Sequence, residues 1–451
     1  MTMRRSLLLL AGMVLHSACL MAGNFSGWWC GKIAVLPVVI HIEQQADRYS
    51  GCLYSPTQTT DSLAFTRIDV NGDSLSFAID PLAITYSGVL TDGPVIKGTY
   101  RQNGRSFRLE MQPSEASDAK ANRPQTPRPP FIYNSENVTF SNDSLRFGAT
   151  MTSPWMPTAG GVVLVSGSGR QNRDEEILGH KPFAVIADFL TRQGWTVLRY
   201  DDRGAGESSP GSPDDTTLDF ADDAMAAADY LRSLPSLADK PVGIIGHSEG
   251  GTIAMIDAAE HPDKVDFVVS LAGMAVKGRD LMIRQNEMIY ELSGQQMPEA
   301  DNRRVRDIFA IIDTASTTAA MAASIDSLMT PAQPDPNMRA TAVSVMTDPW
   351  YVGFVRLDPS PYIKKIRCPL LAVNGTWDVQ VDAAMNLGAI GSLLPSATLR
   401  SMPGLNHFMQ AAPTKAQSFD YGSISRTIEP EVLDVIGNFL IEVTGNFMSG
   451  K

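Results

Sequence analysis

One serine of this chain lies in a sequence context that suits nucleophilic catalysis. Ser248 is flanked by glycines in the stretch 246–250 (GHSEG), which follows a short β-branched run and precedes small residues with a helical pattern. A G-x-S-x-G nucleophile elbow requires this order of strand, sharp turn and helix, whereas the five letters alone often occur by chance in glycine-rich turns. The context therefore predicts that Ser248 is a nucleophile.

A serine hydroxyl is a weak nucleophile, so it needs a base within hydrogen-bond reach and a carboxylate that orients the base. Asp378 follows one predicted strand and His407 follows the next. Among the six histidines, only His407 lies after a late strand and before a long loop. Asp382 competes with Asp378, but it opens the next predicted helix and is more simply a helix N-cap. We therefore predict a triad of Ser248, His407 and Asp378.

Attack on a carbonyl group creates an oxyanion, which backbone N–H groups must stabilise. The amide of Glu249, directly after the nucleophile, is the first predicted donor. The second is expected from the glycine-rich loop that follows the apolar run 161–165, because glycines let the backbone approach a substrate closely. We predict the Ser168 amide in this role, with the amides of Gly167 and Gly169 as alternatives.

Three further stretches carry a resemblance to a known family. Residues 167–175 read GSGRQNRDE, residues 200–208 read YDDRGAGES, and residues 404–407 read GLNH. With the chain order serine, aspartate, histidine, they make residues 131–445 resemble the α/β-hydrolase superfamily. They are similar in particular to bacterial serine carboxylesterases whose Gly-Ser-Gly oxyanion loop is followed by an Arg-Asp-Glu segment. The resemblance implies a hydrolase that cleaves a small-molecule ester through an acyl-enzyme on Ser248 and needs no cofactor.

Charged residues near the predicted oxyanion loop have two alternative roles. Arg173, Asp174, Glu175 and the pair Asp202 and Arg203 can contact substrate, or they can form ion pairs that hold the loops in shape. We expect ion pairs, because charged residues beside such loops more often have this structural role.

Other activities stay open at the level of sequence. A serine peptidase or amidase would use the same triad, although no propeller-like repeat of the prolyl-oligopeptidase kind precedes the catalytic region. Thioesterase and acyltransferase chemistry share the acyl-enzyme. A different class is a non-catalytic protein that binds a glycan or lipid, and the complete triad argues against it.

The elements that must position these residues follow an alternating pattern of strands and helices from residue 137 onward. Predicted strands are 138–140, 145–150, 161–165, 196–200, 242–245, 265–271, 369–373 and 398–402; predicted helices are 182–192, 218–234, 252–260, 383–390 and 430–443. This rhythm predicts an α/β fold, namely a mostly parallel sheet with helices on both faces, as in α/β-hydrolases.

The alternation stops at about residues 278–360, where 280–292, 302–316 and 318–328 are predicted helices. An insertion here would lie over the carboxyl ends of the strands, where open α/β sheets bind ligands. We interpret it as a helical lid; the alternative is a structural helical pair with no part in binding.

The first part of the chain has a different pattern. Residues 24–112 contain short strands at 38–42, 63–70, 74–79, 83–89, 95–100 and 106–110, joined by Asn-Gly and Asp-Gly turns. They predict a small antiparallel β domain, either a barrel or a half-barrel. Its aromatic residues Trp28, Trp29 and Tyr86 fit a core better than a ligand groove. Residues 113–130 are rich in Pro and Ala, and we expect an extended linker.

Residues 1–23 resemble an export signal, with two arginines, an apolar run and small residues at the end. We expect cleavage and a periplasmic or extracellular protein. A permanent anchor is the weaker alternative, because the apolar run is short for a membrane span. Cys19 lies in a stretch similar to a lipoprotein attachment box, so lipidation there is the one membrane association that the sequence offers.

Charge and cysteine content exclude some partners. The formal net charge is −12 and the pI is about 5.0, which argues against nucleic acid. No His and Cys cluster has metal-ligand spacing, so no metal site is predicted. Cys30 and Cys52 either pair in a disulfide or stay free, and Cys368 is expected to be an inert core thiol. The oligomeric state is not indicated.

Overall fold

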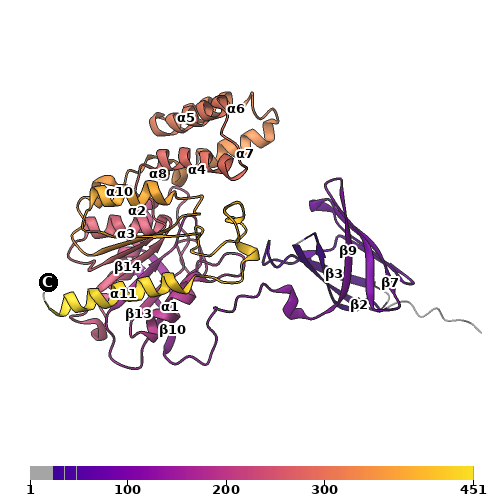
Figure 1. Cartoon of the computed structure of the whole chain (residues 1–451), viewed down its shortest axis with the longest axis horizontal. Coiled ribbons are helices and arrows are strands. Elements are labelled where there is room, and N and C mark those ends of the chain that lie inside the picture. The colour runs from indigo at the N-terminus through magenta and orange to yellow at the C-terminus, as the bar shows by residue number, and fades with distance from the viewer. Residues whose placement is uncertain (1–23, 35, 47, 450–451) are drawn as a thin grey trace, which may run out of the picture. The chain divides into compact units, whose positions relative to one another are not determined.

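The computed structural model describes residues 24–34, 36–46 and 48–449, so the predicted signal with Cys19 lies outside the described residues. The chain divides into two compact units, with the division between Ala121 and Asn122 (Figure 1). Within the described residues, every helix is too short or too polar to cross a membrane.

The first unit is a nine-stranded antiparallel sheet in the order β4-β3-β2-β1-β9-β8-β7-β6-β5. Its edge strands β4 and β5 are separated in the chain by only two residues, so the sheet curls into a half-barrel around an apolar core, as predicted. The strands are β1 (Gly27–Ile33), β2 (Leu36–Gln45), β3 (Arg48–Tyr54), β4 (Leu63–Ala64), β5 (Arg67–Asn71), β6 (Ser74–Ile79), β7 (Ile84–Thr91), β8 (Val95–Gln102) and β9 (Arg105–Ser114), with short 3-10 helices η1 (Asp80–Leu82) and η2 (Ala116–Ala119).

Cysteine and aromatic positions in this unit follow from the register of the strands. Cys30 on β1 lies opposite Val39 of β2, and Cys52 on β3 lies opposite His41 of β2. Because β2 runs between the two cysteines, both thiols are free, and the disulfide alternative is wrong. Trp29 lies in the core, whereas Trp28 stacks on His41 with 4.1 Å between ring centroids.

The second unit is built on an eight-stranded sheet in the order β10-β11-β13-β12-β14-β15-β16-β17. β10 and β11 form an antiparallel hairpin at one edge, and strands β12 to β17 pair in parallel. The strands are β10 (Asn134–Asn142), β11 (Leu145–Ser153), β12 (Gly161–Val165), β13 (Thr196–Tyr200), β14 (Val242–His247), β15 (Val268–Leu271), β16 (Leu370–Gly375) and β17 (Thr398–Met402).

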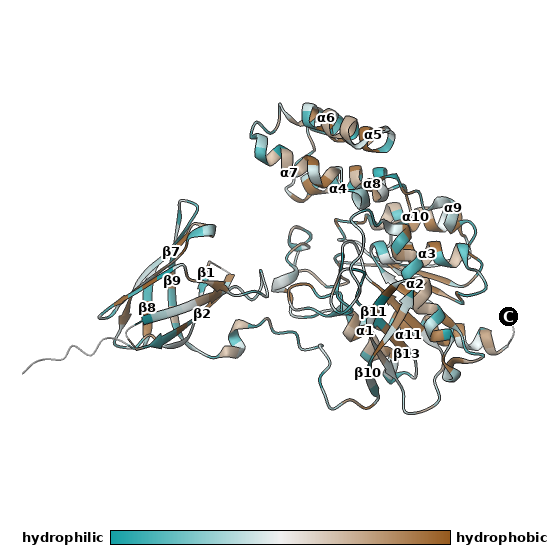
Figure 2. Cartoon of the chain, turned by 180° about the vertical axis from the view of Figure 1, so that it is seen from behind, coloured by the Kyte–Doolittle hydropathy of each residue, from teal (hydrophilic) through white to brown (hydrophobic). Residues whose placement is uncertain are grey.

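Helices cover both faces of this sheet (Figure 2), which explains why its central strands are buried along their whole length and mostly apolar. On one face α1 and α11 pack against the sheet; on the other face α2, α3, α9 and α10 do so. The helices are α1 (Pro182–Arg192), α2 (Thr217–Arg232), α3 (Glu249–Glu260), α9 (Ser360–Ile363), α10 (Ala383–Leu393) and α11 (Pro430–Met448), with 3-10 helices η3 (Pro235–Leu237), η4 (Lys415–Gln417) and η5 (Tyr421–Ser423). The predicted α/β-hydrolase architecture is confirmed.

The insertion between β15 and β16 contains five long helices, two more than predicted (Figure 1). They are α4 (Gly278–Leu292), α5 (Glu299–Thr314), α6 (Thr318–Met329), α7 (Pro336–Met346) and α8 (Pro349–Arg356). The insertion has an apolar core of its own, centred on Ile312 and Ile325. α4 and α8 attach it to the sheet through Leu281 and Phe354, which pack with Val381.

Residues 113–130, predicted as an extended linker, are not extended over their whole length, because part of the segment packs on the second unit. β9 already runs to Ser114, and Arg123 is only 7 % exposed. The Arg123 guanidinium donates to the carbonyl oxygens of Leu178, Gly422 and Ile424 at 2.9, 2.9 and 2.8 Å. Within the described residues Arg123 has no carboxylate partner, so these bonds satisfy the buried cation, and they fix the segment to the loop before α1 and the loop after β17.

Candidate active site

Ser248 lies on a sharp turn between β14 and α3. Its backbone has φ 55° and ψ −121°, a strained combination for a residue with a Cβ. The turn depends on its glycines, because a Cβ on Gly246 would overlap the Gly250 carbonyl and one on Gly250 would overlap the Val165 carbonyl. The half-buried Ser248 is therefore held at the carboxyl edge of the sheet, as an elbow requires.

His407 and Asp378 form a buried pair at the same edge. His407 Nδ1 donates to Asp378 Oδ2 at 2.8 Å, and the two residues are 2 % and 3 % exposed. The other carboxylate oxygen of Asp378 accepts hydrogen bonds from the backbone amides of Gln380 and Val381, both at 2.8 Å. A proton on Nδ1 leaves Nε2 as the basic nitrogen, which is the tautomer that a general base needs.

The loops that carry Ser248 and His407 are joined directly. The imidazole of His247, the residue before Ser248, lies 2.9 Å through Nε2 from the carbonyl oxygen of His407. Among the described residues, the Ser248 hydroxyl itself has no hydrogen-bond partner, and such bonds often tighten only when substrate is bound. The structure thus pairs two of the three predicted residues, and the residue before the third contacts the backbone of His407.

Asp382, the competing carboxylate, has other partners. It caps α10 by accepting the Met385 amide at 2.9 Å, and it forms an ion pair with Arg284 of α4 at 2.9 Å. This agrees with its interpretation as a helix cap, and it ties the helical insertion to the sheet.

The two predicted oxyanion donors differ from Gly167 in their hydrogen bonding. Among the described residues, the amides of Ser168 and Glu249 have no protein acceptor, and the Glu249 amide is the first N–H of α3. The Gly167 amide is excluded, because it donates to Glu175 Oε1 at 2.7 Å. A Cβ on Gly167 would lie 3.1 Å from Ser248 Cβ, so this loop lies directly against the elbow.

Most of the charged residues around the oxyanion loop are engaged with one another. Arg173 binds Asp201 and Glu207, Asp174 binds Lys181 and Arg199, and Arg203 binds Asp215 and Asp223. The Asp202 carboxylate accepts the Gln171 amide at 2.9 Å. These contacts agree with the expected ion pairs for Arg173, Asp174 and Arg203, whereas Asp202 forms no ion pair within the described residues and holds its loop through a backbone amide.

The side chain of Glu249 makes a contact that sequence reasoning missed. It is 3 % exposed, and it accepts hydrogen bonds from Thr217 Oγ1 at 2.6 Å and from Trp350 Nε1 at 3.0 Å. Trp350 lies on α8, so one buried carboxylate next to Ser248 connects the helical insertion to α2. Burial raises the pKa of Glu249 above its usual value, and these hydrogen bonds only partly offset it.

The raised pKa of Glu249 predicts how the stability of the protein changes with pH. A protonated Glu249 favours the folded state at pH values below its unfolded pKa of about 4.3, and this contribution is lost as the pH rises through the higher folded pKa. We expect Glu249→Gln to gain stability relative to the wild type as the pH rises from about 5 to about 8. Urea unfolding at the two pH values measures the difference, and Glu260→Gln at the exposed end of α3 controls for the loss of one charge. A difference that shrinks with pH would contradict the assignment.

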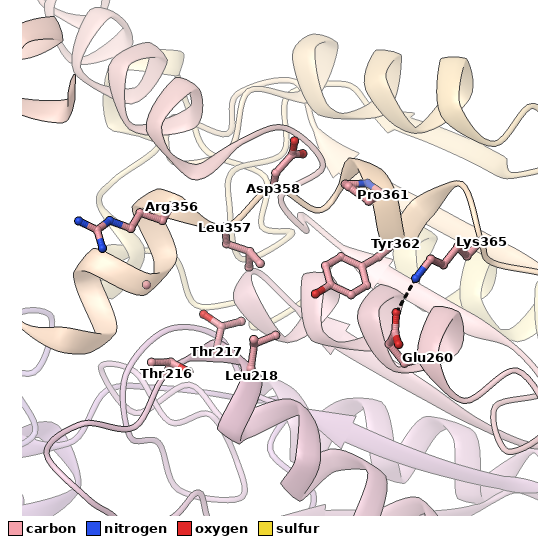
Figure 3. Close-up of a pocket in the computed structure, with 11 residues that line it drawn as sticks. Thr216, Thr217, Leu218, Glu260, Arg356, Leu357, Asp358, Pro361, Tyr362 and Lys365 are labelled. Carbon is pink, nitrogen blue, oxygen red and sulfur yellow. Dashed lines mark hydrogen bonds and ion pairs between the residues drawn. The ribbon is translucent and has the colours of Figure 1, made fainter. Parts of the chain in front are cut away.

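A hollow of about 530 Å³ lies near this contact, between the start of α2, the end of α8 and α9 (Figure 3). Leu218, Arg356 and Tyr362 line it, and an ion pair between Lys365 and Glu260 closes one side. None of the three predicted triad residues lines it. Thr217 lines it and also binds Glu249, which links the hollow to the site.

The sequence is 25% identical to Esterase EstD from Thermotoga maritima over 288 residues, or 62% of each chain. It is 31% identical to Serine hydrolase BPHL from Homo sapiens over 113 residues, or 25% of this chain and 36% of that protein. The chain thus spans about a third of the length of the first curated relatives it matches.

Among solved structures, the chain is similar to Est1E from Butyrivibrio proteoclasticus with ferulic acid bound. It has a TM-score of 0.43 and 17% sequence identity, and the alignment covers 68% of this chain and 99% of that one. The sequence pattern of the alpha/beta hydrolase fold matches residues 162–411, more than half of the chain and the part that contains Ser248, Asp378 and His407. The chain belongs to the alpha/beta hydrolase family.

Proposed function

We propose that this protein is a serine hydrolase that cleaves carboxylic esters through an acyl-enzyme on Ser248. The observation that carries the proposal is the buried His407–Asp378 pair, 2.8 Å apart, at the sheet edge where the strained elbow holds Ser248. Ester chemistry is favoured by the similarity to Esterase EstD over 62% of both chains.

The reaction would proceed in two halves. His407 Nε2 takes the proton of the Ser248 hydroxyl as Oγ attacks the ester carbonyl. The resulting oxyanion accepts hydrogen bonds from the backbone amides of Ser168 and Glu249. The tetrahedral intermediate collapses, and His407 returns the proton to the leaving alcohol. Water then attacks the acyl-enzyme with His407 as base, which releases the carboxylic acid and restores Ser248. Asp378 keeps the imidazole in the required tautomer and stabilises its cation.

We propose that helices α4–α8 act as the lid of this site. They follow β15 at the carboxyl edge of the sheet, and Trp350 on α8 reaches Glu249 beside the nucleophile. We also propose that the protein is exported, on the basis of residues 1–23 alone; N-terminal analysis of the mature chain tests this and would show a lipid on Cys19 if one is attached.

The activity is tested with a fluorophosphonate probe and a panel of p-nitrophenyl esters of increasing acyl length, beside the matching p-nitroanilides. We expect one probe per chain and turnover of esters at higher kcat/KM than anilides. A folded sample with neither labelling nor turnover would contradict the proposal. Faster turnover of the anilides would instead favour a peptidase or amidase with the same triad.

A further inference from the structure

A second carboxylate and imidazole lie buried next to the predicted triad, and the proposed mechanism does not use them. Glu175 and His247 are 2 % and 5 % exposed, and His247 Nδ1 lies 2.8 Å from Glu175 Oε1. The other ring nitrogen, Nε2, lies 2.9 Å from the carbonyl oxygen of His407. Both nitrogens of one imidazole therefore face oxygen acceptors.

This geometry favours a charged pair. A carbonyl oxygen only accepts, so Nε2 of His247 must carry a proton. Glu175 Oε1 also accepts the amide of Gly167 at 2.7 Å, so Nδ1 of His247 donates as well. The arrangement is that of an imidazolium on a carboxylate. Burial alone would lower the pKa of His247, but the charges of Glu175 and Asp378 and the bond to His407 raise it above its usual value.

The pair connects three pieces of the site that lie far apart in the chain. Gly167 precedes the predicted oxyanion donor Ser168, His247 precedes Ser248, and the third partner is the backbone of His407 itself. Glu175 adopts φ 50°, a left-handed conformation that is strained for a residue with a Cβ. Surrounding contacts must hold such a residue in place, and its buried bonds to Gly167 and His247 do so.

We propose that Glu175 and His247 act as one positioning unit that sets the distance between the Ser248 hydroxyl, the His407 ring and the oxyanion donor. The proposal rests on the proposed function, because positioning has meaning only if Ser248 is the nucleophile. Neither residue exchanges a proton with substrate. A misplacement of about 1 Å in such a site can lower the rate about 100-fold, so the unit is expected to affect kcat.

The test compares Glu175→Gln, His247→Gln and the double variant with the wild type. A glutamine at 175 cannot compensate a buried imidazolium, and a glutamine at 247 keeps one donor but leaves Glu175 unpaired. We expect each single variant to lose about 10- to 100-fold in kcat and in the rate of fluorophosphonate labelling, with a much smaller change in KM. Because the two residues form one unit, the double variant should be no slower than the worse single variant.

The matched control is Asp266→Asn. Asp266 forms an ion pair with Arg232 and accepts a hydrogen bond from the Val242 amide at 2.8 Å, at the amino ends of β14 and β15 and so at the opposite edge of the sheet from Ser248. This variant should lose stability, but its folded fraction should be labelled at the wild-type rate. The final extent of labelling measures how large that folded fraction is. If the Glu175–His247 pair has only a structural role, Glu175→Gln and His247→Gln will behave like this control, with lower stability and an unchanged labelling rate.

The outcomes separate this proposal from the proposed function. Folded single variants with wild-type labelling rates, or losses that multiply in the double variant, would overturn the positioning unit alone. A wild-type protein that the probe does not label would overturn both. If the variants do not fold, ¹⁵N spectra of the wild-type histidines decide: at near-neutral pH one buried imidazole should carry protons on both nitrogens, and its absence would overturn the charge on which the unit depends.

Discussion

Ser248→Ala is expected to lower kcat for ester hydrolysis by about a millionfold and to abolish fluorophosphonate labelling. Alanine removes the oxygen that forms the acyl-enzyme, and no other group can substitute for it at the tip of the elbow. Binding and the oxyanion donors remain, so a residual acceleration of about a thousandfold over water is expected. The hydrolysis of p-nitrophenyl esters measures the effect, and circular dichroism checks the fold.

Ser270→Ala is the matched control for Ser248→Ala. Ser270 lies on the neighbouring strand β15, it is 1 % exposed, and within the described residues its hydroxyl has no hydrogen-bond partner. Losing that hydroxyl removes a buried, unpaired polar group, so the variant should fold and keep kcat. More than trace activity in Ser248→Ala would place the nucleophile elsewhere.

Asp378→Asn is expected to lower kcat about ten-thousandfold with little change in KM. The amide nitrogen of asparagine would donate toward His407 Nδ1, so the ring proton would move to Nε2 and the base would face Ser248 in the wrong tautomer. The amides of Gln380 and Val381 still hold the side-chain oxygen, so the fold should survive. Steady-state kinetics on the best ester of the panel gives both constants.

Asp382→Asn is the control for Asp378→Asn. Asparagine is also a good N-cap, so α10 keeps its cap, and the loss of the ion pair with Arg284 should cost about 1 kcal/mol or less. The kcat should stay within a few-fold of the wild type. If this variant loses as much activity as Asp378→Asn, the orienting role belongs to Asp382.

The parts that sequence predicts well are those where short-range pattern and topology agree. The strand, turn and helix around Ser248 are encoded within about fifteen residues. Parallel strands end at the same edge of a sheet, so residues directly after strands β14, β16 and β17 must meet there. The pairing of His407 with Asp378, rather than with Asp382, follows from that rule. The catalytic roles themselves stay predictions.

Contacts between distant segments could not be predicted in the same way. Trp350 reaches Glu249 across a hundred residues of chain, and α8 itself was not predicted. Strands β1 and β3 were missed because glycine weakens a strand pattern. Their glycines admit close neighbours instead: a Cβ on Gly31 would overlap the Glu110 carbonyl, and one on Gly51 would lie 2.7 Å from the Phe65 ring.

The buried guanidinium of Arg123 limits where the N-terminal unit can be removed or exchanged. Its three carbonyl partners belong to the second unit, and those at Gly422 and Ile424 lie in the loop that follows His407. Deleting the chain up to residue 130 would leave these acceptors without their donor and loosen the surroundings of His407. An exchange of the N-terminal sheet between homologous genes therefore preserves the hydrolase unit only if the crossover falls before Asn122. A crossover within the proline-rich tract that follows would remove Arg123 from the unit that it stabilises.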